Sequence, residues 1–181
     1  ARGLLKGIHG YIKENGVWSI FLGEFSRGGC NPEWIKKWDG DGIIARIENS
    51  VIAQIVERTS LPAIDVSSGR YLPEIPMVET DDKAIAQLAV DHLIECGFKN
   101  FGFCGESYNW SKWRQNAFME LTKKKKLTLF TYVFSENMAD KDLNWQLNHL
   151  ALWLKSLPKP IGIFAAFDIR GRQIIEICQM I

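Results

Sequence analysis

The sequence predicts an α/β protein built from parallel sheets with helices on both faces. Short apolar runs typical of strands alternate with longer segments in which apolar residues recur every three or four positions. Glycine, proline, asparagine and aspartate separate the two kinds of segment. The 181 residues, 46% of them hydrophobic, are enough for one large core or two small lobes. This alternation is typical of doubly wound sheets.

The composition excludes several classes of protein. With 22 basic and 21 acidic residues the net charge is +1, which gives no electrostatic case for a nucleic-acid surface in this chain. No apolar run approaches the roughly 20 residues needed to cross a bilayer, so we expect no contact with a membrane. Four cysteines without metal-ligand or disulfide spacing favour a reducing compartment: Cys30, Cys96, Cys104 and Cys178.

The first half of the chain opens on a helical pattern over residues 4–15, which Asn15-Gly16 ends. Asn31 and Asn49 are capping residues that predict helices over 31–38 and 49–56. Strands are expected at Trp18–Leu22, Gly42–Ala45, Ala63–Val66 and Met77–Glu79.

The second half begins with a helix over 82–96, which Thr80 or Asp81 caps and Gly97 ends. Three strands are expected at 101–104, 127–134 and 161–166, and three helices at 110–121, 143–157 and 169–181. The fresh strand–helix series after Gly97 favours two lobes, residues 1–97 and 98–181. The last helical pattern has no terminator, so we expect the chain to be part of a longer protein that also holds the first strand of one lobe and the last strands of the other.

Motifs for catalysis are incomplete. Gly105-Glu106-Ser107 resembles the start of a nucleophile elbow, but Asn109 stands where the second glycine is needed. Neither a dinucleotide fingerprint nor a phosphate loop occurs. The Asp39–Gly42 turn lacks the later oxygen ligands of a calcium loop, and the three histidines lack metal spacing. We therefore expect no enzyme activity, no cofactor and no metal.

Polar residues follow the predicted strands, where parallel sheets bind ligands. Trp110, Ser111 and Arg114 come just after the strand that ends at Gly105. A sugar offers hydroxyl groups and apolar C–H faces. An aromatic ring, a hydroxyl and a guanidinium group together are complementary to these features. The alternative is an ordinary amphipathic helix, with Trp113 in the core and Arg114 in a surface ion pair.

An ordered series of motifs resembles the sensor region of xylose-operon regulators, over essentially the whole chain. These are AraC-type activators whose N-terminal half is LacI/GalR-like and periplasmic-binding-protein-like. The segments that carry the resemblance are Trp38–Ala45, Glu79–Asp82 with Ala86–Leu93, Cys96–Phe98, Phe103–Gly105, Trp113–Phe118, Leu152–Pro158 and Ala166–Gln173.

The resemblance implies that a sugar, xylose or another pentose, binds in a cleft between two lobes. It also implies a homodimeric cytoplasmic regulator that reads DNA through a C-terminal helix-turn-helix domain beyond residue 181. Carried over by position, the ligand-binding residues are Glu24, Arg46, Asp81, Asp82, Ser107, Trp110, Arg114 and Asp168. Arg114 matches the arginine that grips the sugar, whereas Phe167 replaces the usual asparagine before Asp168.

Two other classes stay open at this point. A secreted sugar-binding protein of a transporter would share the fold, although the scattered cysteines argue against an oxidising space. An α/β enzyme would need a nucleophile or a cofactor site, and the fold alone does not decide among the three.

Overall fold

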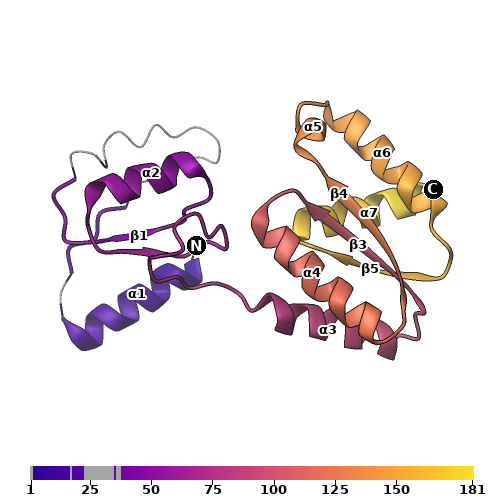
Figure 1. Cartoon of the computed structure of the whole chain (residues 1–181), viewed down its shortest axis with the longest axis horizontal. Coiled ribbons are helices and arrows are strands. Elements are labelled where there is room, and N and C mark those ends of the chain that lie inside the picture. The colour runs from indigo at the N-terminus through magenta and orange to yellow at the C-terminus, as the bar shows by residue number, and fades with distance from the viewer. Residues whose placement is uncertain (1, 17, 23–34, 36–37) are drawn as a thin grey trace. The chain divides into compact units, whose positions relative to one another are not determined.

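The computed structural model describes residues 2–16, 18–22, 35 and 38–181, which fall in two compact units, Ala1–Trp34 and Ile35–Ile181. The first unit holds α1 (Arg2–Asn15), an amphipathic helix (Figure 1). Gly16 ends it with a positive φ of 128° and donates its N–H to the Ile12 carbonyl at 3.1 Å. The helix and its terminator are thus where the sequence predicts them.

Residues 18–22 form neither a helix nor a strand, so the strand predicted at Trp18–Leu22 is wrong. Trp18 is 50% exposed and Leu22 is 59% exposed. An apolar run becomes a strand only when a neighbouring strand pairs with its backbone, and the run alone does not supply that neighbour. The helix predicted over 31–38 lies largely outside the described residues.

The second unit begins with a two-stranded parallel sheet, in which Ile43 pairs with Ala63 and Ala45 with Asp65. Its elements are β1 (Ile43–Ala45), α2 (Ser50–Thr59) and β2 (Ala63–Asp65). Asn49 caps α2 as predicted, because its side chain accepts a hydrogen bond from the Ile52 N–H at 2.9 Å. A core of Ile47, Ala53, Val56 and Ala63 lies between helix and sheet.

The strand predicted at Met77–Glu79 is reduced to one isolated parallel bridge between Asp65 and Met77. The Asp65 N–H donates to the Pro76 carbonyl at 2.9 Å, and the Val78 N–H donates to the Asp65 carbonyl at 2.8 Å. The adjacent Pro76 has no N–H to donate to a ladder, which limits the pairing.

A three-stranded parallel sheet with the order β4-β3-β5 forms the rest of this unit. Figure 1 shows its elements from α3 to α7. They are α3 (Asp82–Glu95), β3 (Asn100–Glu106), α4 (Asn109–Lys124), β4 (Thr128–Phe134), α5 (Glu136–Ala139), α6 (Leu143–Ser156), β5 (Ile161–Ala165) and α7 (Asp168–Met180). The short α5 was not predicted, because four residues carry no helical period.

Helices cover both faces of this sheet. Phe101 and Phe103 point from β3 into a core shared with α3 and α4, where they meet Val90 and Phe118. Cys104 points the other way, into a core with residues of α6 and α7 such as Leu150, Leu154, Ile174 and Ile177. Side chains alternate between the faces of a strand, so the central strand is buried on both sides. The doubly wound parallel fold is therefore confirmed, while the division at residue 97 stays a prediction.

Over the described ranges, no helix combines the length and the apolar character that a membrane span requires.

Candidate functional site

The three strands of the second sheet end at the same edge, because all are parallel. At this edge β3 ends in Glu106 and β4 ends in Phe134, which pair in register. β5 continues into Ala166, whose N–H donates to the Cys104 carbonyl at 2.8 Å. The turns that follow these strands lead into α4, α5 and α7 and carry the polar side chains predicted from the sequence.

Arg114 lies at the centre of this edge, on the second turn of α4. Its Nε donates to Oδ1 of Asp82 at 2.9 Å, and its Nη1 donates to the Ala166 carbonyl at 2.6 Å. Its Nη2 donates to Oγ1 of Thr80 at 3.3 Å. The side chains of Arg114 and Asp82 are only 15% and 9% exposed. The guanidinium therefore joins α3, α4 and the end of β5, and it is not the surface ion pair of the alternative interpretation.

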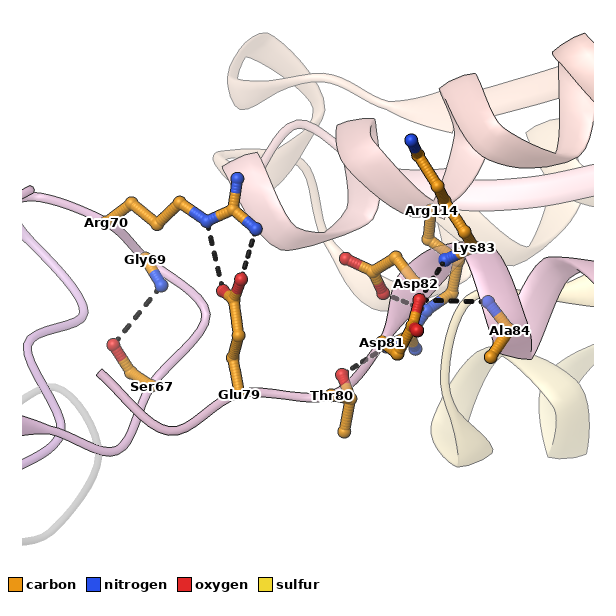
Figure 2. A network of polar contacts seen from close by, with 10 residues as sticks. All are labelled: Ser67, Gly69, Arg70, Glu79, Thr80, Asp81, Asp82, Lys83, Ala84 and Arg114. Atoms are coloured by element: carbon orange, nitrogen blue, oxygen red, sulfur yellow. Dashed lines mark hydrogen bonds and ion pairs between the residues drawn. The ribbon is translucent and has the colours of Figure 1, made fainter. Parts of the chain in front are cut away.

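The second oxygen of Asp82 is buried and, within the part of the chain that the structure describes, has no hydrogen-bond partner. Figure 2 shows one carboxylate oxygen joined to Arg114 and the other directed away from the guanidinium. A buried acceptor left unsatisfied costs about 1–3 kcal/mol. A ligand hydroxyl that donates to this oxygen would recover that cost.

Asp81 has a different role from its neighbour. Its Oδ1 accepts from the N–H groups of Lys83 and Ala84 at 2.9 and 3.0 Å, which caps α3. These bonds are drawn in Figure 2. Asp81 and Asp82 are equal candidates in the sequence analysis, and the structure distinguishes them by their partners.

Aromatic rings line the same edge beside Arg114. Trp110 meets Phe167 edge-on with 5.6 Å between ring centroids, and it stacks on Tyr108 at 6.2 Å. The Arg114 guanidinium lies 5.7 Å from the Trp110 ring centroid. An apolar surface beside a guanidinium group has the chemistry to contact the C–H face and the hydroxyls of a sugar.

A second ion pair crosses the edge. Arg170 on α7 donates from Nε to Oε1 of Glu106 at 2.6 Å, and the two side chains are 12% and 10% exposed. The Arg170 guanidinium carbon lies 3.3 Å from the Phe134 ring centroid. The ligand-binding residues predicted from the sequence include neither Arg170 nor Glu106. The signal available in the sequence was the position of Arg170, two residues after Asp168.

Burial raises the pKa of the Cys104 thiol to about 12, with Arg170 lowering it and Glu106 raising it to smaller extents. A thiol with such a pKa stays protonated at neutral pH and is a poor nucleophile. The thiol is therefore part of the core beneath the edge.

Two further predicted residues lie at the edge with fewer contacts. Ser107 is half-buried, and its N–H donates to the Phe134 carbonyl at 3.0 Å. Asp168 is exposed in the first turn of α7.

The structure does not place the remaining two predicted residues at this edge. Arg46 is exposed next to β1 and pairs with Glu48, with its Nε 3.0 Å from Oε1. Glu24 lies outside the described residues.

Asp82 is among the residues that line a cavity of about 550 Å³. Beside it, Arg70 donates from Nε to Oε2 of Glu79 at 3.0 Å (Figure 2), and its guanidinium carbon lies 3.9 Å from the Trp113 ring centroid. Hydrogen bonding to Glu79 raises the pKa of Arg70 above its usual value. The cavity is lined by Arg70, Glu79, Thr80, Asp81, Asp82, Lys83, Trp113, Asn116, Ala117 and Glu120. Arg70 and Trp113 therefore form a wall of this cavity that the site prediction did not include.

Comparison with known proteins places this geometry in a family. Residues 90–180 match the model of the periplasmic binding protein-like domain, and residues 1–83 match that of the XylR N-terminal domain. The chain belongs to the periplasmic-binding-protein-like domain family.

Within this family the chain is similar to xylose operon regulatory proteins. That of Haemophilus influenzae is 32% identical over 98% of this chain and 48% of the relative, and that of Escherichia coli K12 is 31% identical over 98% and 47%. The structure of a xylose-binding transcription activator matches with a TM-score of 0.82 and 29% identity, over 99% of this chain and 46% of the other. The chain thus spans about half the length of the curated relatives it matches.

These relatives are transcription regulators, and the resemblance stated from the sequence is confirmed. The periplasmic-binding-protein-like fold predicted from the sequence is also confirmed.

Proposed function

We propose that this chain is the sensor domain of a transcription regulator and binds a neutral sugar, xylose or another pentose, at the edge formed by Arg114, Asp82 and Trp110. The observation that carries the proposal is a buried Asp82 oxygen that has no partner among the described residues, next to the paired Arg114. A sugar hydroxyl is both donor and acceptor, so it satisfies that oxygen while accepting from the fork.

Aromatic rings and further polar side chains near Arg114 supply the other contacts that we propose for the sugar. Trp110 and Phe167 offer an apolar surface for the C–H face of the ring. Ser107 and Asp168 stand nearby at the carboxyl ends of β3 and β5 and supply further groups for hydroxyls. Phe167 in place of the family's asparagine removes one hydroxyl partner and adds an aromatic wall.

The wider role follows from the family. We propose that sugar binding closes two lobes, residues 1–97 and 98–181, and that the closed population changes DNA binding by a separate AraC-type helix-turn-helix domain. In this account the protein is a cytoplasmic homodimer, the sugar undergoes no reaction, and neither a cofactor nor a membrane takes part. The relatives named above are transcription regulators, which supports this role over an enzyme or a transporter component.

A panel of pentoses and hexoses tests the proposal by thermal unfolding. A ligand that binds only the folded state stabilises it by about 2.7 kcal/mol at a hundredfold excess over Kd. We expect xylose or another pentose to raise the melting temperature, with hexoses acting less. A folded protein that shows no shift with any of these sugars would contradict the proposal.

A further inference from the structure

The turn Ala166–Asp168 carries part of the proposed sugar site and begins α7. Phe167 packs on Trp110, and the Ala166 carbonyl accepts from Arg114. The strand side of the turn is fixed, because the Ala166 N–H donates to the Cys104 carbonyl. The position of the turn therefore depends on what holds the start of α7.

The start of α7 has no side-chain cap among the described residues. Phe167 occupies the N-cap position, where a serine, threonine, aspartate or asparagine normally accepts from the first turn. The first backbone bond of the helix runs from the Gly171 N–H to the Phe167 carbonyl at 3.1 Å. An uncapped start frays unless another contact holds it.

Arg170 supplies such a contact. Its Nε reaches Oε1 of Glu106 at 2.6 Å, its Nη1 reaches Oε1 of Gln173 at 2.6 Å, and its guanidinium covers Phe134. One side chain from α7 thus contacts the ends of β3 and β4. Because the Arg170–Glu106 pair is almost entirely buried, solvent screens it little.

Glu106 is itself held in place. Its N–H donates to Oγ of Ser111 at 2.8 Å, and Ser111 is fully buried in the first turn of α4. Gly105 makes this approach possible, since a Cβ there would lie 2.6 Å from that oxygen. The backbone of Glu106, whose carboxylate receives Arg170, is therefore held by the same helix that carries Trp110 and Arg114.

We propose that Arg170 is a positioning residue, which holds the Phe167–Asp168 turn against Trp110 through its buried pair with Glu106 and thereby sets the sugar affinity. The inference rests on the proposed function, because the affinity in question is that for the sugar. It assigns to Arg170 no contact with the sugar. Its effect passes through the position of Phe167 and through the Ala166 carbonyl.

The test compares Arg170→Met with Arg172→Met, a matched control on the same helix. Arg172 forms an exposed pair with Glu176, with side chains 73% and 58% exposed. Amide hydrogen exchange at Gly171 is measured without sugar, and the Kd for D-xylose by calorimetry. We expect Arg170→Met to speed exchange at Gly171 about tenfold or more and to weaken D-xylose binding about tenfold. Arg172→Met should change neither.

A double variant separates positioning from the penalty of an unpaired charge. Arg170→Met leaves Glu106 buried without its partner, whereas adding Glu106→Gln removes that charge and should recover stability. We expect the double variant to regain melting temperature but to keep the fast exchange and the weak binding. It also serves as the test protein if Arg170→Met alone does not fold.

Two results would overturn the inference. One is exchange at Gly171 that matches the Arg172→Met control, and the other is D-xylose affinity that returns to the wild-type value in the double variant while the turn stays loose. If the wild-type protein binds neither D-xylose nor another pentose, the proposed function fails, and the role of Arg170 in holding the turn is still decided by the exchange measurement alone.

Discussion

Arg114 and Asp82 form an ion pair that is almost fully buried and uses only one oxygen of the carboxylate. The Nε–Oδ1 distance is 2.9 Å, and the other oxygen has no partner in the described part of the chain. A buried pair is a weak source of stability, because desolvation offsets most of the attraction. The proposed sugar site would account for an incomplete pair at this edge, because ligands of parallel-sheet proteins bind at the carboxyl ends of the strands.

Replacing Arg114 should affect both binding and folding. Arg114→Ala removes three hydrogen bonds and leaves Asp82 without its cation. We expect sugar affinity to fall by a factor of about 10 to 100 and the free energy of unfolding to fall by about 3–5 kcal/mol. Arg114→Lys should recover little, because a point charge does not reproduce the planar fork.

Calorimetry with D-xylose and urea unfolding measure the two effects of Arg114→Ala separately. Arg172→Ala, which removes an exposed arginine, should leave both quantities close to the wild type. Wild-type affinity together with a sharply lowered stability would mean that Arg114 has a structural role only.

The aromatic wall should contribute to affinity more than to folding. Trp110→Leu keeps an apolar side chain but loses the edge-on contact with Phe167 and the surface for the sugar. We expect D-xylose affinity to fall about 3- to 10-fold. Trp145→Leu is the control, since Trp145 lies on α6 and stacks on His149 instead. Equal affinities of the two variants would exclude Trp110 from the site.

Alkaline pH should destabilise the protein through Cys104. Burial raises the pKa of this thiol from about 9 to about 12, so the unfolded chain releases the proton first. Stability is therefore fully present below pH 9 and is lost as the pH rises toward 12, by at most about 1.4 kcal/mol per pH unit. Urea unfolding between pH 8 and pH 11 should show a shallower decline in Cys104→Ala than in the wild type. Parallel curves would mean that the thiol titrates normally in the folded state.

Local signals in the sequence predicted much of the fold. The three strands of the second sheet, the caps at Asn49 and Asp81 and the terminator at Gly97 all lie where their residue types indicated. Each depends on a periodic pattern or on one residue's backbone preference, which neighbours within a few positions determine. The strand predicted at residues 18–22 was wrong, because a strand also depends on pairing with a segment that is distant in the sequence.

The sequence predicted where the candidate site residues lie, but not which side chains they pair with. Parallel topology brought Ser107, Trp110, Arg114 and Asp168 to one edge, as expected from the positions of the strands. The sequence offered Asp81 as a helix cap, but it did not show that the neighbouring Asp82 is buried and paired with Arg114. Nor did it show that Arg170 reaches Glu106, 64 positions away. Such contacts depend on packing between elements, for which a single sequence carries no periodic signal.

The most direct test of the central claim is a calorimetric titration of D-xylose into the wild-type protein and Asp82→Asn. The asparagine oxygen still accepts from Arg114, but an amide donor replaces the carboxylate oxygen for which the described residues supply no partner. Asp91→Asn on the exposed side of α3 is the matched control. We predict one-site binding to the wild type and the control, and affinity about tenfold weaker or worse in Asp82→Asn. Equal affinity in all three proteins, or no binding of D-xylose or another pentose to the wild type, would contradict the account.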